Sequence, residues 1–117
     1  MIARKQSWKR PTAKRIERGE VWVVDPGYVV KVRPCLVLSI PPTDLDRALA
    51  TLIPCTTSIR GSRFEVGLDI RFLDRHGAFD AQNLMTVSTA KFVKRLGSLA
   101  TEQMDQVEQV VRLRLGL

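Results

Sequence analysis

The sequence predicts one small, mostly β domain with a single helix at its C-terminal end. Several short β-branched or apolar runs, separated by proline, glycine and hydroxyl residues, are typical of an antiparallel sheet that curls into a small barrel. The last part of the chain instead repeats apolar side chains at helical spacing. At 117 residues the chain is near the commonest size of a single domain.

The first two predicted strands are separated by a loop. Glu20–Asp25 is β-branched and aromatic, and Pro26 and Gly27 after it have the composition of a turn. Pro34–Ile40 is apolar on both faces, as a central strand is, and its proline stands at the first residue, where the missing N–H is tolerated. A pair of prolines then ends this run.

Four further strand candidates follow a short helical turn or excursion over Thr43–Ala48. The second of them alternates polar and apolar residues, which is the pattern of a strand with one solvent-facing side. The last two are weaker, and Gly97 closes the region. In chain order the candidates cover Leu49–Cys55, Arg63–Asp69, Phe79–Ser88 and Phe92–Leu96.

The C-terminal segment has the signals of one helix. Thr101 is a good N-cap, Glu102 places negative charge in the first turn, and Gly116 stands where a helix would end. An apolar stripe at helical spacing predicts that the helix packs on the sheet. The stripe consists of Met104, Val107, Val110 and Val111.

The positive charge is concentrated at the N-terminal end. Residues 1–18 hold seven Lys and Arg residues against one Glu, which gives them +6 of the formal net charge of +7. We divide the chain into a basic extension, residues 1–17, expected to be flexible, and a domain over residues 18–117. Trp8 could stack on a base while the basic residues contact phosphates; a solvated extension is the alternative.

Composition excludes several classes of protein. No apolar run reaches the length of a membrane helix, and no signal peptide is recognisable, so the cytoplasm is the expected compartment. Cys35 and Cys55 lie in apolar runs, which indicates reduced, buried thiols rather than a disulfide framework. Two separated cysteines and one histidine do not make a zinc site, so neither a metal nor a cofactor is predicted.

Arg33 is the first candidate for function. Pro34 disfavours helical geometry at the residue before it, so the backbone of Arg33 should be extended and its side chain should project from the loop before a strand. Lys31, two residues earlier, should point to the same side. A guanidinium suits a phosphate, and the alternative is an ordinary surface salt bridge.

A run of hydroxyls is the second candidate. Thr56, Thr57 and Ser58 follow an apolar strand and precede Arg60 and a flexible Gly61. Hydroxyls and backbone donors beside an arginine could cradle an oxyanion. Alternatively, the hydroxyls merely bond to nearby backbone, as they commonly do at strand ends.

Four segments, in this order and at these spacings, resemble the MazF/PemK (Kid) toxin family: Arg18–Trp22 (RGEVW), Arg33–Ser39 (RPCLVLS), Pro54–Ser58 (PCTTS) and Arg63–Val66 (RFEV). The resemblance extends over about residues 16–117. It implies the small SH3-like barrel with a C-terminal helix of the PemK, MazF and CcdB toxins. It also implies a homodimer that an acidic antitoxin protein masks.

The activity implied by this resemblance is cleavage of single-stranded RNA without a metal, by attack of the ribose 2′-hydroxyl. The products would be a 2′,3′-cyclic phosphate and a 5′-hydroxyl. Carried over residue by residue, Arg33 would stabilise the charge that accumulates on the phosphate, and Thr56 would hold or polarise the same group. The remaining RNA contacts would be Lys31, Thr57, Ser58, Arg60, Arg63 and Gln82.

The chain departs from the family pattern in two places. Residues 27–32 carry no carboxylate, and Asp80 precedes Gln82 by two residues where many members have adjacent Asp and Gln, a shift expected to turn the carboxylate to the opposite strand face. The general base therefore stays open among Asp25, Asp80 and a substrate group. His76, before Gly77, is expected in a turn. Alternative functions are a nucleic-acid-binding regulator without catalysis and a gyrase-type, protein-binding poison on the same barrel.

Overall fold

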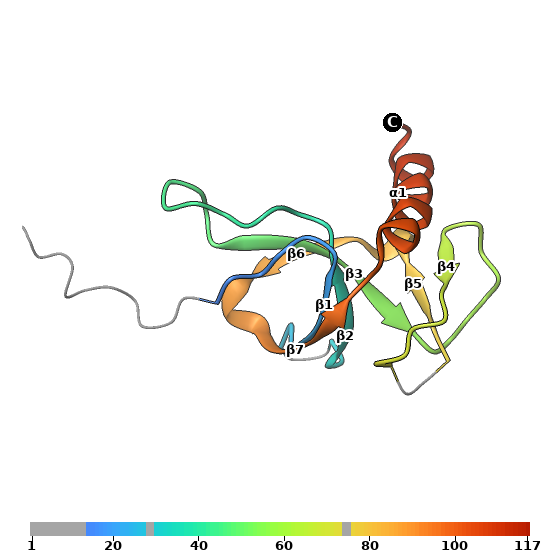
Figure 1. The fold of residues 1–117 in the computed structure, drawn as a ribbon, viewed down its shortest axis with the longest axis horizontal. Coiled ribbons are helices and arrows are strands. Elements are labelled where there is room, and N and C mark those ends of the chain that lie inside the picture. The colour runs from blue at the N-terminus through green and yellow to red at the C-terminus, as the bar shows by residue number, and fades with distance from the viewer. Residues whose placement is uncertain (1–13, 28–29, 74–75) are drawn as a thin grey trace, which may run out of the picture.

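The computed structural model describes residues 14–27, 30–73 and 76–117. Within them the chain forms a seven-stranded antiparallel sheet and one α-helix (Figure 1). This confirms the predicted fold class. The elements are β1 (Glu20–Val24), β2 (Arg33–Val37), β3 (Leu49–Thr56), β4 (Glu65–Gly67), β5 (Ala78–Asp80), β6 (Met85–Ser88), β7 (Phe92–Ser98) and α1 (Thr101–Leu115), with the 3₁₀ turns η2 (Ala81–Asn83) and η3 (Thr89–Lys91).

The long strand β3 connects the two parts of the sheet. The strand order is β4-β5-β3-β2-β1-β7, and β6 also pairs with β3. The first half of β3 pairs with β6, whereas its last residues pair with β5, so that Thr56 lies opposite Ala78. The pairing of β1 with β7 shifts register twice, between Val21 and Trp22 and between Val23 and Val24. Together these features curl the sheet, as Figure 1 shows.

The central strands are buried on both faces, as predicted for the second run, because side chains alternate along a strand. Val21 and its neighbours on one face pack under α1 with Met104 and Val107. On the other face Trp22 packs in a second core with Phe92, and their rings meet edge to face with centroids 5.8 Å apart. The two faces therefore bury two separate apolar clusters.

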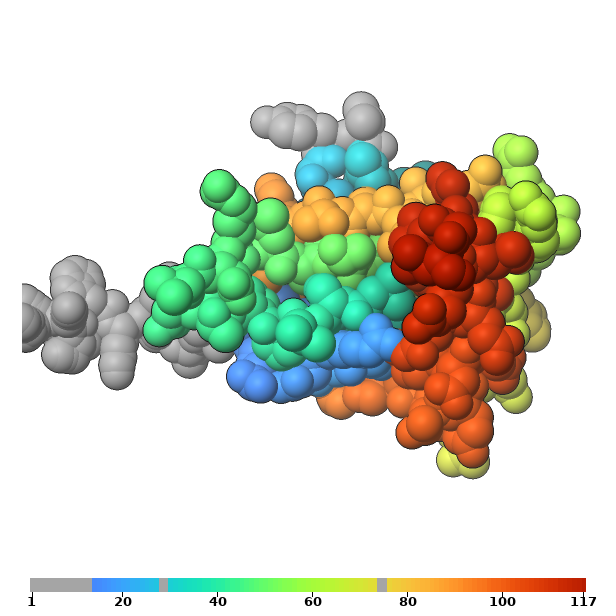
Figure 2. All heavy atoms as spheres, turned by 90° about the horizontal axis from the view of Figure 1, so that it is seen from above, coloured from blue at the N-terminus to red at the C-terminus, as the bar shows by residue number. Residues whose placement is uncertain are grey.

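Helix α1 ends as predicted but begins differently. Gly116 adopts a left-handed φ of 74° at the C-cap. At the N-terminal end Ala100, not Thr101, is the N-cap, and its N–H is satisfied by the side chain of Gln103 (2.9 Å). Thr101 is already helical, so the predicted role of its side chain as the cap is wrong. Figure 2 shows α1 at the same end of the molecule as residues 57–67.

The boundaries of several predicted strands change. Arg33 is the first residue of β2 rather than part of the preceding loop, and β2 ends before Ile40. The candidate Phe79–Ser88 is not one strand, because the Asp80 carboxylate accepts the N–H of Gln82 (3.1 Å) and starts η2 between β5 and β6. Of Arg63–Asp69, only the three residues of β4 form a strand.

Part of the basic extension belongs to the packed chain. Residues 1–13, including Trp8, lie outside the described residues. Ile16, which we assigned to the extension, is 2% exposed and belongs to the core cluster of Trp22. Lys14 donates a hydrogen bond to the carbonyl of Phe92. The described residues contain no helix of the length and apolar character needed to span a bilayer.

Candidate functional site

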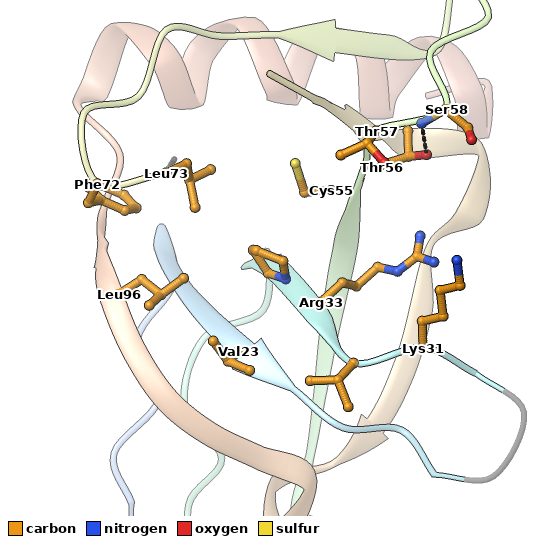
Figure 3. Close-up of a pocket in the computed structure, with 12 residues that line it drawn as sticks. Val23, Lys31, Arg33, Cys55, Thr56, Thr57, Ser58, Phe72, Leu73 and Leu96 are labelled. Carbon is orange, nitrogen blue, oxygen red and sulfur yellow. Dashed lines mark hydrogen bonds between the residues drawn. The ribbon is translucent and has the colours of Figure 1, made fainter. Parts of the chain in front are cut away.

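A cavity of about 390 Å³ lies where β2 begins and β3 ends (Figure 3). One side of its lining is polar and cationic. The other side is an apolar wall that includes Val23, Phe72, Leu73 and Leu96. The polar residues are Lys31, Arg33, Thr56, Thr57 and Ser58. The two sequence candidates, the arginine and the hydroxyl run, are therefore parts of one site.

The strand register explains why Arg33 and Thr56 meet. Cys35 lies opposite Pro54 in the antiparallel pair of β2 and β3. Continuing this register by two residues brings Arg33 level with Thr56. Directly opposite residues of antiparallel strands point to the same face of the sheet. In Figure 3 the guanidinium of Arg33 extends toward the side of the cavity that Thr56 lines.

The cavity has an excess of positive charge. Arg33 is half-buried and Lys31 is exposed, and both head groups point to the hydroxyl side in Figure 3. Among residues 14–27, 30–73 and 76–117, no ion pair involves either side chain. Two cations share this cavity, and its described lining residues include no carboxylate. This combination makes a site for a phosphate or another anion.

The hydroxyl of Thr56 is oriented by the backbone that follows it. The N–H of Ser58 donates to the Thr56 oxygen over 3.0 Å (Figure 3). A hydroxyl can accept bonds and donate one proton at the same time. In this bond the Thr56 oxygen is the acceptor, so the bond does not use the hydroxyl proton. That proton can therefore be donated to an anion in the cavity.

Three predicted RNA contacts lie outside the cavity lining. Arg60 uses its backbone N–H to bond Glu65. The guanidinium of Arg63 lies 4.7 Å from the ring centroid of Phe64. Gln82 is exposed in η2. The structure therefore brings five of the eight predicted site residues together, and leaves these three beside the site rather than in it.

Neither candidate carboxylate for the general base lines the cavity. Asp25 accepts the N–H of Gly27 over 3.1 Å, and Asp80 caps η2. His76 is exposed and is also absent from the lining. In the part of the chain that the structure describes, no three His, Cys, Asp or Glu side chains group as metal ligands.

Cys55 lines the cavity, whereas Cys35 is buried in the core cluster of Trp22. Burial raises the pKa of the Cys35 thiol to about 12, although the nearby Arg33 opposes this shift. Burial likewise raises the pKa of Cys55, which lines the cavity and is only partly buried. Both thiols therefore stay protonated at neutral pH, so neither is a nucleophile there.

Two glycines allow the cavity walls to approach closely. A Cβ on Gly77 would lie 2.9 Å from both the Cys55 sulfur and the Thr56 carbonyl oxygen. A Cβ on Gly97 would lie 2.5 Å from the ring of Phe72, which forms part of the apolar wall. Sequence reasoning missed this wall. The only signal for it was Gly97 itself, which does not reveal what packs against it.

Comparison with known proteins identifies relatives of the whole domain. Residues 17–115 match the family model described as PemK-like, MazF-like toxin of type II toxin-antitoxin system. The chain is 37% identical over 89 residues to a Mycobacterium tuberculosis protein named "Probable endoribonuclease MazF5", an alignment that covers 74% of this chain and 81% of that protein.

Solved structures share the fold. A mycobacterial endoribonuclease in complex with its cognate antitoxin superposes with a TM-score of 0.74 at 24% identity, covering 87% of this chain and 96% of that one. A MazF structure from Deinococcus radiodurans gives a TM-score of 0.74 at 21% identity, covering 90% of this chain and 100% of that one. At these identities the likeness establishes the fold.

Proposed function

This chain belongs to the PemK-like, MazF-like toxin family of type II toxin-antitoxin systems, and we propose that it is a toxin that cuts single-stranded RNA without a metal ion. The observation that carries the proposal is the convergence of Arg33, Lys31 and Thr56 on one cavity that is free of carboxylates among its described lining residues. The curated relative that shares 37% identity is named as an endoribonuclease.

Arg33 has the main catalytic role in the proposed reaction. The ribose 2′-hydroxyl loses its proton to water or to a substrate group as its oxygen attacks the adjacent phosphorus. The bond to the 5′-oxygen of the next nucleotide breaks, and that oxygen takes up a proton. The products are a 2′,3′-cyclic phosphate and a 5′-hydroxyl. Negative charge increases on the non-bridging oxygens as phosphorus becomes five-coordinate, and a fixed guanidinium stabilises this state more than the ground state.

Thr56 and Lys31 complete the phosphate site. The Thr56 hydroxyl can donate to a non-bridging oxygen, because its own oxygen already accepts the Ser58 N–H. Lys31 adds a second positive charge, and Thr57 and Ser58 supply hydroxyls at the rim. In this proposal Arg60, Arg63 and Gln82 contact only the RNA strand beyond the cavity. Stabilisation of the transition state, rather than a named general base, is what the described residues supply.

Cleavage of RNA in the presence of a chelator tests this function. Purified protein should cut unstructured RNA in EDTA and leave cyclic phosphate ends. Arg33→Ala should lower kcat on the order of 10² to 10³-fold. Arg47→Ala is the matched control, since it removes the same charge from an exposed position near the far end of β3. An inert wild type on diverse RNAs would contradict the proposal.

The proposed partners are an acidic antitoxin and a second copy of the chain. The net charge of +7 and the cationic cavity suit an acidic segment that covers the site and blocks RNA. Structural neighbours include a mycobacterial endoribonuclease in complex with its cognate antitoxin. We place the action of this toxin in the cytoplasm, where RNA is available. Co-purification with a short acidic protein, followed by loss of cleavage, checks this partnership.

A second function has one observation in its favour. Among the described residues that line the cavity there is no carboxylate or imidazole to accept the 2′-hydroxyl proton. A regulator that binds RNA without cutting it would fit this lining. It would show salt-dependent binding, with a slope of about −0.7 per phosphate contacted, and intact RNA. Turnover that is lost on Arg33→Ala excludes it.

A further inference from the structure

The loop over residues 57–64 joins β3 to β4 and carries two of the cavity hydroxyls, Thr57 and Ser58. Both of its ends are fixed on β5, because Thr56 pairs with Ala78 and Glu65 pairs with Asp80. Between these ends the loop has no strand partner. Its last residue is held from outside the loop, because the Phe64 carbonyl accepts the N–H of Ala81 (2.9 Å) and Phe64 packs against the core. The conformation of the residues before Phe64 therefore depends mainly on bonds made within the loop and to Glu65 next to it.

Glu65 supplies most of those bonds. Its carboxylate accepts three consecutive backbone N–H groups, from Arg60 (3.1 Å to each oxygen), Gly61 (2.7 Å) and Ser62 (3.0 Å). Consecutive N–H groups that converge in this way form an anion-binding nest. Gly61 makes the nest possible with a φ of 75°, which other residues adopt reluctantly.

The carboxylate is charged when it makes these bonds. The N–H of Arg60, followed by those of Ser62 and Gly61, lowers the pKa of Glu65, and the charge of Arg60 adds to the effect. A negative charge next to an RNA path repels phosphate. The three charge-assisted hydrogen bonds that Glu65 accepts from the loop offset this repulsion.

We propose that Glu65 is a positioning residue for RNA: its carboxylate holds the 57–64 loop so that the Thr57 and Ser58 hydroxyls stay at the rim of the cavity. This inference rests on the proposed ribonuclease function. Glu65 acts through the loop and touches neither the scissile phosphate nor the cavity. It therefore governs how often the free protein has its rim ready for RNA, and the apparent affinity falls with that fraction.

The Glu65→Gln variant separates positioning from simple electrostatics, because the two predict opposite signs. Removing a negative charge should by itself tighten RNA binding. Loss of the clamp should instead raise KM on the order of tenfold. The fall in kcat should be smaller than this, because Arg33 stays on β2 and only the Ser58 N–H that orients Thr56 belongs to the loop. Asp105→Asn, at an exposed position on α1, is the matched control for the change of charge.

Gly61→Ala tests the same loop without changing any charge. A Cβ at Gly61 meets no atom within 4 Å, so the substitution acts only through the positive φ. It should raise KM in the same direction as Glu65→Gln. Assays are run at a temperature where circular dichroism shows every variant folded, and if Glu65→Gln does not fold, Gly61→Ala alone decides.

Affinity for a 2′-deoxy version of the cut oligonucleotide, which cannot react, is measured in parallel. Weaker binding by both loop variants, with Asp105→Asn unchanged or tighter, supports the inference. If both loop variants match that control in KM and in affinity, the inference is overturned although the ribonuclease stands. A wild type that binds RNA but never cuts it overturns the ribonuclease instead, and the binding arm still decides the role of Glu65.

Discussion

Arg18 shortly precedes β1 and Arg33 begins the neighbouring strand β2, yet the surroundings of these two arginines differ. Arg18 forms an ion pair with Glu108 of α1 and donates to the carbonyl of Leu38 over 2.6 Å. Arg33 has no ion-pair partner among the described residues. A cavity of about 360 Å³ adjoins Arg18, but both members of the ion pair line it.

This difference separates a structural arginine from a functional one. The charge of Arg18 is neutralised within the protein, so the cavity beside it has little attraction for an anion. The charge of Arg33 is left for a ligand, although holding an unpaired cation half-buried costs free energy. Residues that a protein does not need for its own stability, held rigidly at the end of a strand, indicate a binding site.

Loss of the Arg33 side chain should have the largest effect. Arg33→Ala should cost on the order of 3 to 4 kcal/mol of transition-state stabilisation, while the free energy of unfolding stays unchanged or rises. Arg18→Ala should show the reverse pattern, with nearly full kcat. Cleavage rates and urea denaturation of both variants measure the contrast. Equal loss of rate in the two variants would remove the distinction.

The comparison also requires that the walls of the Arg33 cavity keep their shape. Gly77→Ala would place a Cβ 2.9 Å from the Thr56 carbonyl and the Cys55 sulfur, so β5 and β3 must move apart. Overpacking of this kind costs about 1 to 3 kcal/mol of stability. A lower midpoint of denaturation together with slower cleavage is expected. An unchanged midpoint would show that the wall adapts freely.

Thr56 sharpens the assignment of the phosphate site. Thr56→Val keeps the shape but removes both the proton donor and the acceptor for the Ser58 N–H. The loss of one hydrogen bond to a charged phosphate predicts a cost of about 1.5 to 3 kcal/mol in kcat/KM. Thr56→Ser retains the hydroxyl and should recover most of the rate. Single-turnover kinetics of the two variants distinguish the hydroxyl from the packing.

Arg18→Ala should have the smallest effect, and only on stability. The pair with Glu108 is more than one-third exposed on both sides, so solvent screens it. Together with the lost bond to the Leu38 carbonyl, about 1 kcal/mol of unfolding free energy is expected. High salt should reduce this difference, and urea titrations at two salt concentrations measure it. A cost that does not respond to salt would mean that packing of the arginine stem dominates.

Local signals in the sequence explain why much of the fold could be predicted. Pro34 restricts the backbone before it, β-branched runs specify strands, and Gly116 ends α1 where a left-handed residue is needed. The sequence predicted that Arg33 and the hydroxyls lie next to the ends of strands. The ordered motifs of the family indicated that they belong to one site. Their alignment across β2 and β3 follows from strand pairing, which a single sequence indicates only weakly.

Other features depended on partners far apart in the chain. Asp80 could be a base or a cap by its residue type, and only its bond to the Gln82 N–H shows that it caps η2. No feature of the sequence marks Phe72 as part of the cavity wall, and only the close approach of its ring to Gly97 shows this role. Thr101 was the better N-cap by propensity, but the chain enters the helix one residue earlier and Gln103 satisfies Ala100.

The sequence by itself determined the helix and the approximate positions of most strands, because these follow from backbone restriction and from the spacing of apolar side chains. It also indicated the family and the two main candidate residues through the order of its motifs. The tertiary structure alone decided which charges are neutralised and which stay open. Arg18 forms an ion pair with Glu108, and Glu65 accepts hydrogen bonds from N–H groups of the loop before it. Arg33 has no acidic partner among the described residues. Such pairings are set by distances in space, which residue order does not specify.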